Sequence, residues 1–162
     1  MTVERAGISD IDRLVEARLA YLCEDSGPLS GHDKTAIQTG LPDYFLAHLD
    51  RDLFCYVIRG AEAIVSCAFL LVVEKPMSPS FLNGRTGLVL NVYTAPAYRR
   101  RGCARAVMTA LLNDAAKLQL SRVELKSTGD GVPLYRSIGF VDDGDKYRSM
   151  KWTPAARTDS AP

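Results

Sequence analysis

Residues 91–105 read Asn91-Val-Tyr-Thr-Ala-Pro-Ala-Tyr-Arg-Arg-Arg-Gly-Cys-Ala-Arg105, and no other stretch says as much about the architecture of the chain. They run from an apolar strand through a break at Pro96 into a basic, glycine-containing turn, and an amphipathic helix follows. A helix N-terminus presents unpaired backbone N–H groups and the positive end of the helix dipole. With three arginines beside it, such an end suits a polyanion, and we expect it to hold a pyrophosphate.

The helix after this turn has one apolar face. Its apolar residues recur at helical spacing and are Val107, Met108, Leu111, Leu112 and Ala115. Gly102 would let the backbone approach a ligand closely, and the small Ala104 would let the helix pack tightly on a sheet. A basic turn alone is often only solvated surface, so this interpretation needs a second signal.

That signal is a strand, loop and short helix further along the chain. Residues 122–126 read as a strand, 127–131 as a loop and 132–138 as a helix. Pro133 lies in the first turn of this helix, where its missing N–H does no harm. Gly139-Phe140 would end the helix and begin another strand.

Two motifs in these segments resemble those of the GNAT superfamily of acyl-CoA-dependent acyltransferases. Arg99-x-x-Gly102-x-Ala104 is similar to the Arg/Gln-x-x-Gly-x-Gly/Ala signature of that family, and Leu134-Tyr135-x-x-x-Gly139-Phe140 resembles its second conserved element. Each motif alone is weak, but the two occur in the family's order and in its strand-turn-helix context. The resemblance can be followed from about residue 2 to residue 152, over the N-terminal third only as a pattern of elements.

The remaining pattern predicts one domain over residues 1–152, followed by a disordered tail over residues 153–162. The expected strands are 2–6, 53–58, 63–73, 88–94 and 122–126, with a closing hairpin of 139–141 and 146–152. Ser9 is expected to cap a first helix, and a second helical region over 33–50 would break near Gly40 and restart at Pro42. The resemblance implies an α/β fold with a central mixed, splayed β-sheet flanked by helices on both faces.

Composition excludes several classes of protein. The chain has 162 residues, 47% hydrophobic and 24% charged, and its net charge of +1 gives no bulk attraction to nucleic acid or acidic membranes. No apolar run approaches the ~20 residues of a membrane span, and the N-terminus does not read as a signal peptide, so we expect a cytoplasmic protein. Neither histidine stands at metal-ligand spacing from a cysteine or carboxylate, so we expect no metal.

The resemblance implies acetyl-CoA as the co-substrate. The backbone and side chains of the arginine turn would hold its phosphates, and the strand end before Pro96 would pair with its pantetheine arm. A backbone N–H near Val92 would polarise the thioester carbonyl. The candidate binding residues are Val92, Tyr93, Thr94, Arg99, Arg100, Arg101, Gly102, Cys103, Ala104, Arg105, Thr128 and Gly131.

Tyr135 is the candidate general acid, because a phenol with a pKa near ~10 is protonated at pH 7 and can protonate the departing thiolate. The general base is open between Glu74 and Asn91, the latter through a water, with Glu24 and Asp25 as alternatives. Cys103 occupies the variable position of the first motif. We do not expect it to act as a nucleophile, since direct attack on a thioester needs no covalent enzyme intermediate.

Arg18 falls on the apolar face of the first helix. It either extends to the edge of that face to reach solvent or faces the acceptor pocket and binds a carboxylate. Acidic residues around the expected acceptor mouth, namely Glu24, Asp25, Glu74, Asp142 and Asp143, indicate a cationic amine.

Three function classes follow from these features. The first is an N-acetyltransferase that moves an acetyl group from acetyl-CoA to a primary amine of a small molecule or protein. The second is a catalytically idle acyl-CoA-binding sensor, and the third, binding of nucleic acid, lacks an extended basic face. We therefore expect no nucleic-acid or membrane partner. A homodimer is compatible with the resemblance, because many members of the family pair, but the sequence does not fix the oligomeric state.

Overall fold

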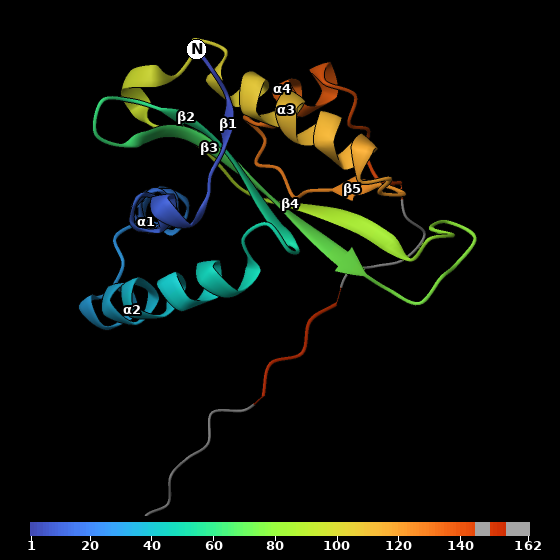
Figure 1. Ribbon diagram of the computed structural model, residues 1–162, viewed down its shortest axis with the longest axis horizontal. Coiled ribbons are helices and arrows are strands. Elements are labelled where there is room, and N and C mark those ends of the chain that lie inside the picture. Colours follow the sequence, from blue (N-terminus) through green and yellow to red (C-terminus); the bar gives the residue numbers. More distant parts are fainter. Residues whose placement is uncertain (145–149, 155–162) are drawn as a thin grey trace, which may run out of the picture.

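A five-stranded sheet forms the centre of the computed structural model, which describes residues 1–144 and 150–154 (Figure 1). The strands follow the order of the chain and are β1 (Glu4–Arg5), β2 (Leu53–Arg59), β3 (Ile64–Glu74), β4 (Arg85–Thr94) and β5 (Val123–Glu124). The first four are antiparallel neighbours, and β5 pairs parallel to β4. The mixed sheet expected from the sequence is confirmed.

Helices cover both faces of this sheet (Figure 1). One face carries α1 (Ile11–Ser26) and α2 (Gly31–His48), and the other carries α3 (Cys103–Lys117) and α4 (Val132–Ser137). Short 3₁₀ turns, η1 (Ile8–Asp10) and η2 (Pro96–Tyr98), precede α1 and α3. No helix in the described part of the chain is both long and apolar enough to span a membrane.

Each face of the sheet has its own apolar core. On the α3 face the buried side chains include Tyr56, Leu70, Val107, Met108 and Leu111. On the α1 face they include Leu14, Phe45, Leu53, Val57 and Phe69. Successive residues of β2 and β3 enter opposite cores, which explains why both strands read as unbroken apolar runs rather than alternating ones.

Three details differ from the sequence-based expectation. The second helix is continuous, with Pro42 inside it, because only the N–H that proline lacks is lost and Phe45 still anchors α2 in the core. Ser9 does not cap α1; it lies in η1, and the carboxylate of Asp10 accepts the Gly7 N–H instead, at 2.9 Å. Residues 139–141 form no strand, and their expected partner strand lies largely outside the described residues, as does most of the predicted tail.

The sheet opens beyond its centre. Strand β5 pairs with β4 only at Gly87 and Leu88. From Val89 to Thr94, β4 therefore has no strand beside it on that side among the described residues. This is the splayed sheet that the resemblance implies.

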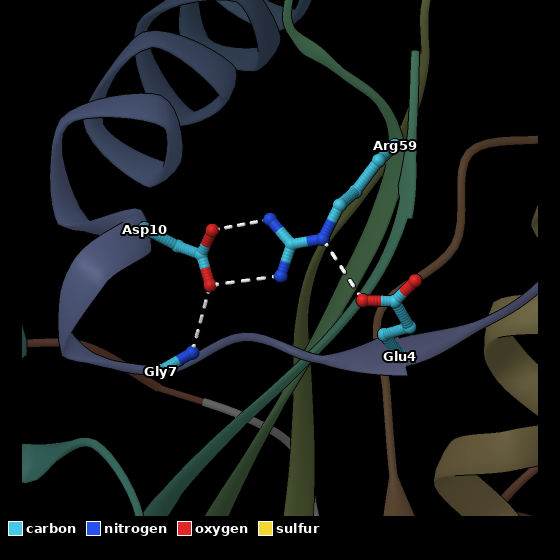
Figure 2. Close-up of polar contacts among 4 residues, drawn as sticks. All are labelled: Glu4, Gly7, Asp10 and Arg59. Atoms are coloured by element: carbon cyan, nitrogen blue, oxygen red, sulfur yellow. Dashed lines mark hydrogen bonds and ion pairs between the residues drawn. The ribbon is translucent and has the colours of Figure 1, made fainter. Parts of the chain in front are cut away.

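A buried ion pair fixes the start of α1 to the sheet (Figure 2). Arg59, the last residue of β2, binds both carboxylate oxygens of the buried Asp10, with Nη2 to Oδ2 at 3.0 Å. Its Nε also donates to Glu4 of β1 at 3.0 Å. One guanidinium thus joins β1, β2 and the N-terminal end of α1, and it sets where the remainder of α1 lies over β4.

We predict that Asp10→Asn lowers the free energy of unfolding by about 1–3 kcal/mol at pH 7. Hydrogen bonds from Arg59 hold the pKa of Asp10 below its ordinary value. The stabilisation is therefore complete above the unfolded-state pKa of about 4 and is lost as the pH falls through the lower native value. Urea unfolding from pH 7 to pH 3 measures this. Asp12→Asn, in the exposed first turn of α1, is the matched control, and a pH-independent difference between Asp10→Asn and wild type would contradict the prediction.

Candidate active site

The turn between β4 and α3 has the conformation of an anion site. Arg100 (φ 61°) and Gly102 (φ 80°) both have left-handed backbone conformations, which reverse the chain directly before α3. A side chain at Gly102 would point into open space, so it is the backbone conformation that favours glycine there.

This turn leaves consecutive backbone donors free. The first hydrogen bond of α3 runs from the Ala106 N–H to the Gly102 carbonyl at 3.0 Å. Within the described part of the chain, the N–H groups from Arg100 to Arg105 donate to no acceptor. They lie at the positive end of a 15-residue helix, where an anion is stabilised.

The four predicted arginines of this segment have different surroundings. Arg100 and Arg101 are exposed, and the Arg101 guanidinium lies 5.5 Å from the centre of the Tyr98 ring. Arg99 forms an ion pair with Glu24 of α1 and donates to the Thr94 carbonyl at 3.0 Å. Arg105 donates to Ser137 of α4 at 2.8 Å. The side chains of Arg100 and Arg101 are therefore the ones best placed to screen a bound anion.

Cys103 contributes only its backbone to this corner. Its side chain is buried in the α3 core, with Sγ 3.4 Å from the Tyr98 carbonyl. The neighbouring Ala104 is partly buried at the start of α3. Both N–H groups remain available to a ligand at the turn.

A β-bulge interrupts β4 where the sheet opens. Cys67 pairs with Tyr93 and Phe69 pairs with Leu90, so Asn91 and Val92 together lie opposite the single residue Ala68. Asn91 has a φ of 52°, which bends the strand and redirects the backbone groups beside it. This distortion is in the pairing with β3, and it falls within the stretch of β4 whose opposite edge β5 leaves uncovered.

The side chain of Asn91 is buried and fully engaged. Its Oδ1 accepts a hydrogen bond from Arg18 of α1 at 3.1 Å, and its Nδ2 lies 3.4 Å from Cys67 Sγ. These contacts hold the bulge between α1 and β3. They do not test whether Asn91 holds a catalytic water, and that role stays a prediction.

The residues after the bulge point in different directions. Val92 packs toward the α3 core and Tyr93 toward the α1 core. The hydroxyl of Thr94 lies 2.8 Å from that of Ser66 on β3. Their side chains are thus occupied within the protein, and their contribution to ligand binding would come from the backbone.

Tyr135 lies on α4 and lines a cleft together with residues of β5. Its ring is half-buried and packs edge-to-face on Phe140 with centroids 5.9 Å apart. Its hydroxyl has no hydrogen-bond partner in the part of the chain that the structure describes. Burial raises the pKa of Tyr135, and Tyr21 of α1 adds to this shift, so the phenol is protonated at neutral pH.

Tyr21 is the site residue that sequence reasoning missed. Its charge contributes to the raised pKa of Tyr135, although α1 and α4 lie on opposite faces of the sheet. The signal was present, because Tyr21 follows Leu14 and Arg18 on the inward face of α1 at helical spacing.

The loop before α4 packs against the ring of Tyr135 at Gly131. The Gly131 N–H donates to the Thr128 carbonyl at 3.0 Å, closing a turn. A Cβ at Gly131 would lie 2.9 Å from Cε2 of Tyr135 and 2.8 Å from Ser127 Oγ. The absence of a side chain at Gly131 therefore allows the phenol to sit where it does.

The structure does not bring Glu74 into this group. Glu74 is exposed at the end of β3, opposite Arg85 at the start of β4. At ~3.4 Å per strand residue, Asn91 lies about 20 Å further along β4. The role of Glu74 as the general base stays a prediction, and this position of Glu74 does not support it.

Comparison with known proteins identifies the class to which this site belongs. The model of the Acetyltransferase (GNAT) family matches residues 19–140, which is most of the chain. The chain belongs to the GNAT acetyltransferase family.

The individual proteins that resemble this chain share only about a quarter of its residues in the aligned regions. An uncharacterized N-acetyltransferase ycf52 of Porphyra purpurea is 28% identical over 72 residues, which cover 44% of this chain and only 41% of the relative. A predicted acetyltransferase of Clostridium acetobutylicum, crystallised with acetyl-CoA, is 26% identical with a TM-score of 0.79, covering 93% of this chain and 95% of the other. A GCN5-related N-acetyltransferase of Ralstonia eutropha is 25% identical with a TM-score of 0.75, covering 92% and 97%.

We predict that Gly131→Ala lowers the acetyltransferase kcat about 10-fold or more, because the added methyl displaces the Tyr135 ring. The matched control is Gly129→Ala in the same loop, where a Cβ meets nothing within 4 Å. Steady-state kinetics on both variants measure the effect. Equal rates for the two would show that the Gly131 contact does not position the phenol.

Proposed function

We propose that this protein transfers an acetyl group from acetyl-CoA to a primary amine of a small molecule or protein. The observation that carries the proposal is the row of free N–H groups from Arg100 to Arg105 at the start of α3, shortly after the stretch of β4 that β5 leaves uncovered. Further support comes from the acetyl-CoA in the crystal structure of the Clostridium acetobutylicum relative.

The residues present fit coenzyme A. Free amides at a helix N-terminus and the exposed side chains of Arg100 and Arg101 suit its diphosphate. The backbone of residues 92–94 would hold the pantetheine arm along the uncovered edge of β4. The loop that contains Thr128 and Gly131 would border the same gap. When bound, acetyl-CoA supplies an activated acetyl group and a thiolate leaving group.

The chain supplies orientation and protons. A backbone N–H at the bulge near Val92 would stabilise the oxyanion that develops on the acetyl carbonyl, an effect commonly worth about 3 kcal/mol. The phenol of Tyr135 would donate the proton that the leaving thiolate needs. The base that deprotonates the amine is left unassigned.

The proposal extends to the setting of the protein. We place it in the cytoplasm, with an amine acceptor as its partner and without nucleic acid or membrane. Pairing into a homodimer remains compatible with it. The alternative, an idle acyl-CoA sensor, is less favoured because a sensor would not need a half-buried phenol whose hydroxyl is free to reach a ligand.

Acetyl-CoA turnover in a panel of amines tests the function. Wild type should release CoA in the presence of at least one amine, and Tyr135→Phe should lower kcat about 100-fold or more while keeping acetyl-CoA affinity, because only the transferable proton is removed. Tyr56→Phe is the control, since its hydroxyl bonds Asp114 away from the gap. Binding of acetyl-CoA without turnover of any amine would favour the sensor, and unchanged turnover in Tyr135→Phe would remove the acid role.

A further inference from the structure

A cavity of about 340 Å³, wide open to solvent, lies between α1 and α2 on the sheet face opposite α3. Five of its lining residues are apolar or lack a side chain, and they are Leu22, Ala36, Ile37, Gly40 and Leu41. The sixth is Arg18, the one charged residue of the lining. The volume is that of a small-molecule site.

Arg18 has only neutral neighbours. Its Nη1 donates to the Asn91 carboxamide at 3.1 Å, and its guanidinium lies 5.4 Å from the centre of the Tyr21 ring. Its charge also acts on Tyr44 and Cys67, but burial raises the pKa of both groups, to about 12 for Cys67, so both are uncharged at neutral pH. Among the described residues, no carboxylate lies within ion-pair distance of Arg18.

Two of the acidic residues expected around the acceptor mouth are paired with other arginines. Glu24, the closest to the turn between β4 and α3, is taken up by Arg99. Asp142, on the far side of the gap, pairs with Arg136. The half-buried Arg18 guanidinium thus keeps donors for an anion from outside the protein, and a planar guanidinium matches a carboxylate in two parallel hydrogen bonds.

The position of Arg18 relates the cavity to the proposed chemistry. The 3.1 Å contact joins its side chain to Asn91, the residue that bends β4 at the bulge. An acceptor whose carboxylate is held by Arg18 would therefore have its nearby atoms close to the bulge of β4. Any apolar group it carries would lie in the cavity between α1 and α2.

We infer that the amine acceptor carries a carboxylate close to its amine and an apolar side chain, as in an apolar α-amino acid, and that Arg18 binds that carboxylate. This inference rests on the proposed function and specifies its acceptor. The alternative acceptor, a polypeptide amine without a carboxylate beside it, is an outcome of the test.

Matched acceptors test the role of Arg18. Leucine, leucinamide and 3-methylbutylamine share one apolar group and differ in the carboxylate. Wild type should acetylate leucine with a kcat/KM about 10- to 100-fold above that of the other two, and Arg18→Gln should remove this preference. Arg13→Gln, on the exposed side of α1, should retain it. A purely positioning role through Asn91 would lower all three rates together and leave their ratio unchanged, which would overturn the inference.

Gly40 gives a test that does not depend on folding. A Cβ there meets nothing within 4 Å, and the residue lies in a helix, so Gly40→Leu should fill the cavity without lowering the melting temperature. We expect the KM for leucine to rise at least about 10-fold while the KM for acetyl-CoA stays unchanged. An unchanged KM for leucine would place the acceptor elsewhere.

Failure of the inference differs from failure of the proposed function. If acetyl-CoA binds and the amines without a carboxylate react as well as leucine, the acceptor inference is wrong and the acetyltransferase proposal stands. If calorimetry detects no acetyl-CoA binding, the proposed function is wrong, and the acceptor inference that rests on it falls with it. If acetyl-CoA binds but neither reaction nor saturable binding of leucine is detected, the acceptor inference is also overturned.

Discussion

The bulge at Asn91 and Val92 is the constraint on which the site depends. The bulge changes the register between β3 and β4 within the stretch whose opposite edge the two-residue β5 leaves free. The extra residue, with the left-handed φ of Asn91, bends the strand as β5 diverges from it. The strain is held by the side chain of Asn91, which is fixed between Arg18 on α1 and Cys67 on β3.

Helix α1 connects the stability of the fold with the geometry of the site. Its N-terminal end is fixed by the Asp10–Arg59 pair, Arg18 in its middle bonds Asn91 at the bulge, and Glu24 near its end pairs with Arg99 of the turn before α3. A shift of α1 would therefore disturb the bulge and this turn together. In the proposed reaction, this arrangement lets one rigid helix set the distance between the two substrates.

The sequence predicted the half of the site that local backbone chemistry determines. Gly102 before an apolar helix, and Tyr135 in a proline-started helix, are local signals, and the hydrogen bond from Arg105 to Ser137 links the two helices. The bulge could not be predicted, because its register depends on pairing between β3 and β4 rather than on residue type. The influence of Tyr21 on Tyr135 and the neutral surroundings of Arg18 depend on how α1 packs over β4. They could therefore not be predicted from the sequence. Pro42 inside α2 shows tertiary packing overriding a local helix-breaking signal.

In the proposed function, the main chain at the start of α3 binds the diphosphate of coenzyme A. Amide NMR during titration with coenzyme A tests it most directly, because each N–H is observed separately. We expect large shifts and slowed hydrogen exchange for the amides from Arg100 to Arg105, which are free of partners within the described structure. Saturable binding that leaves these amides unchanged, or no binding at all, would contradict it.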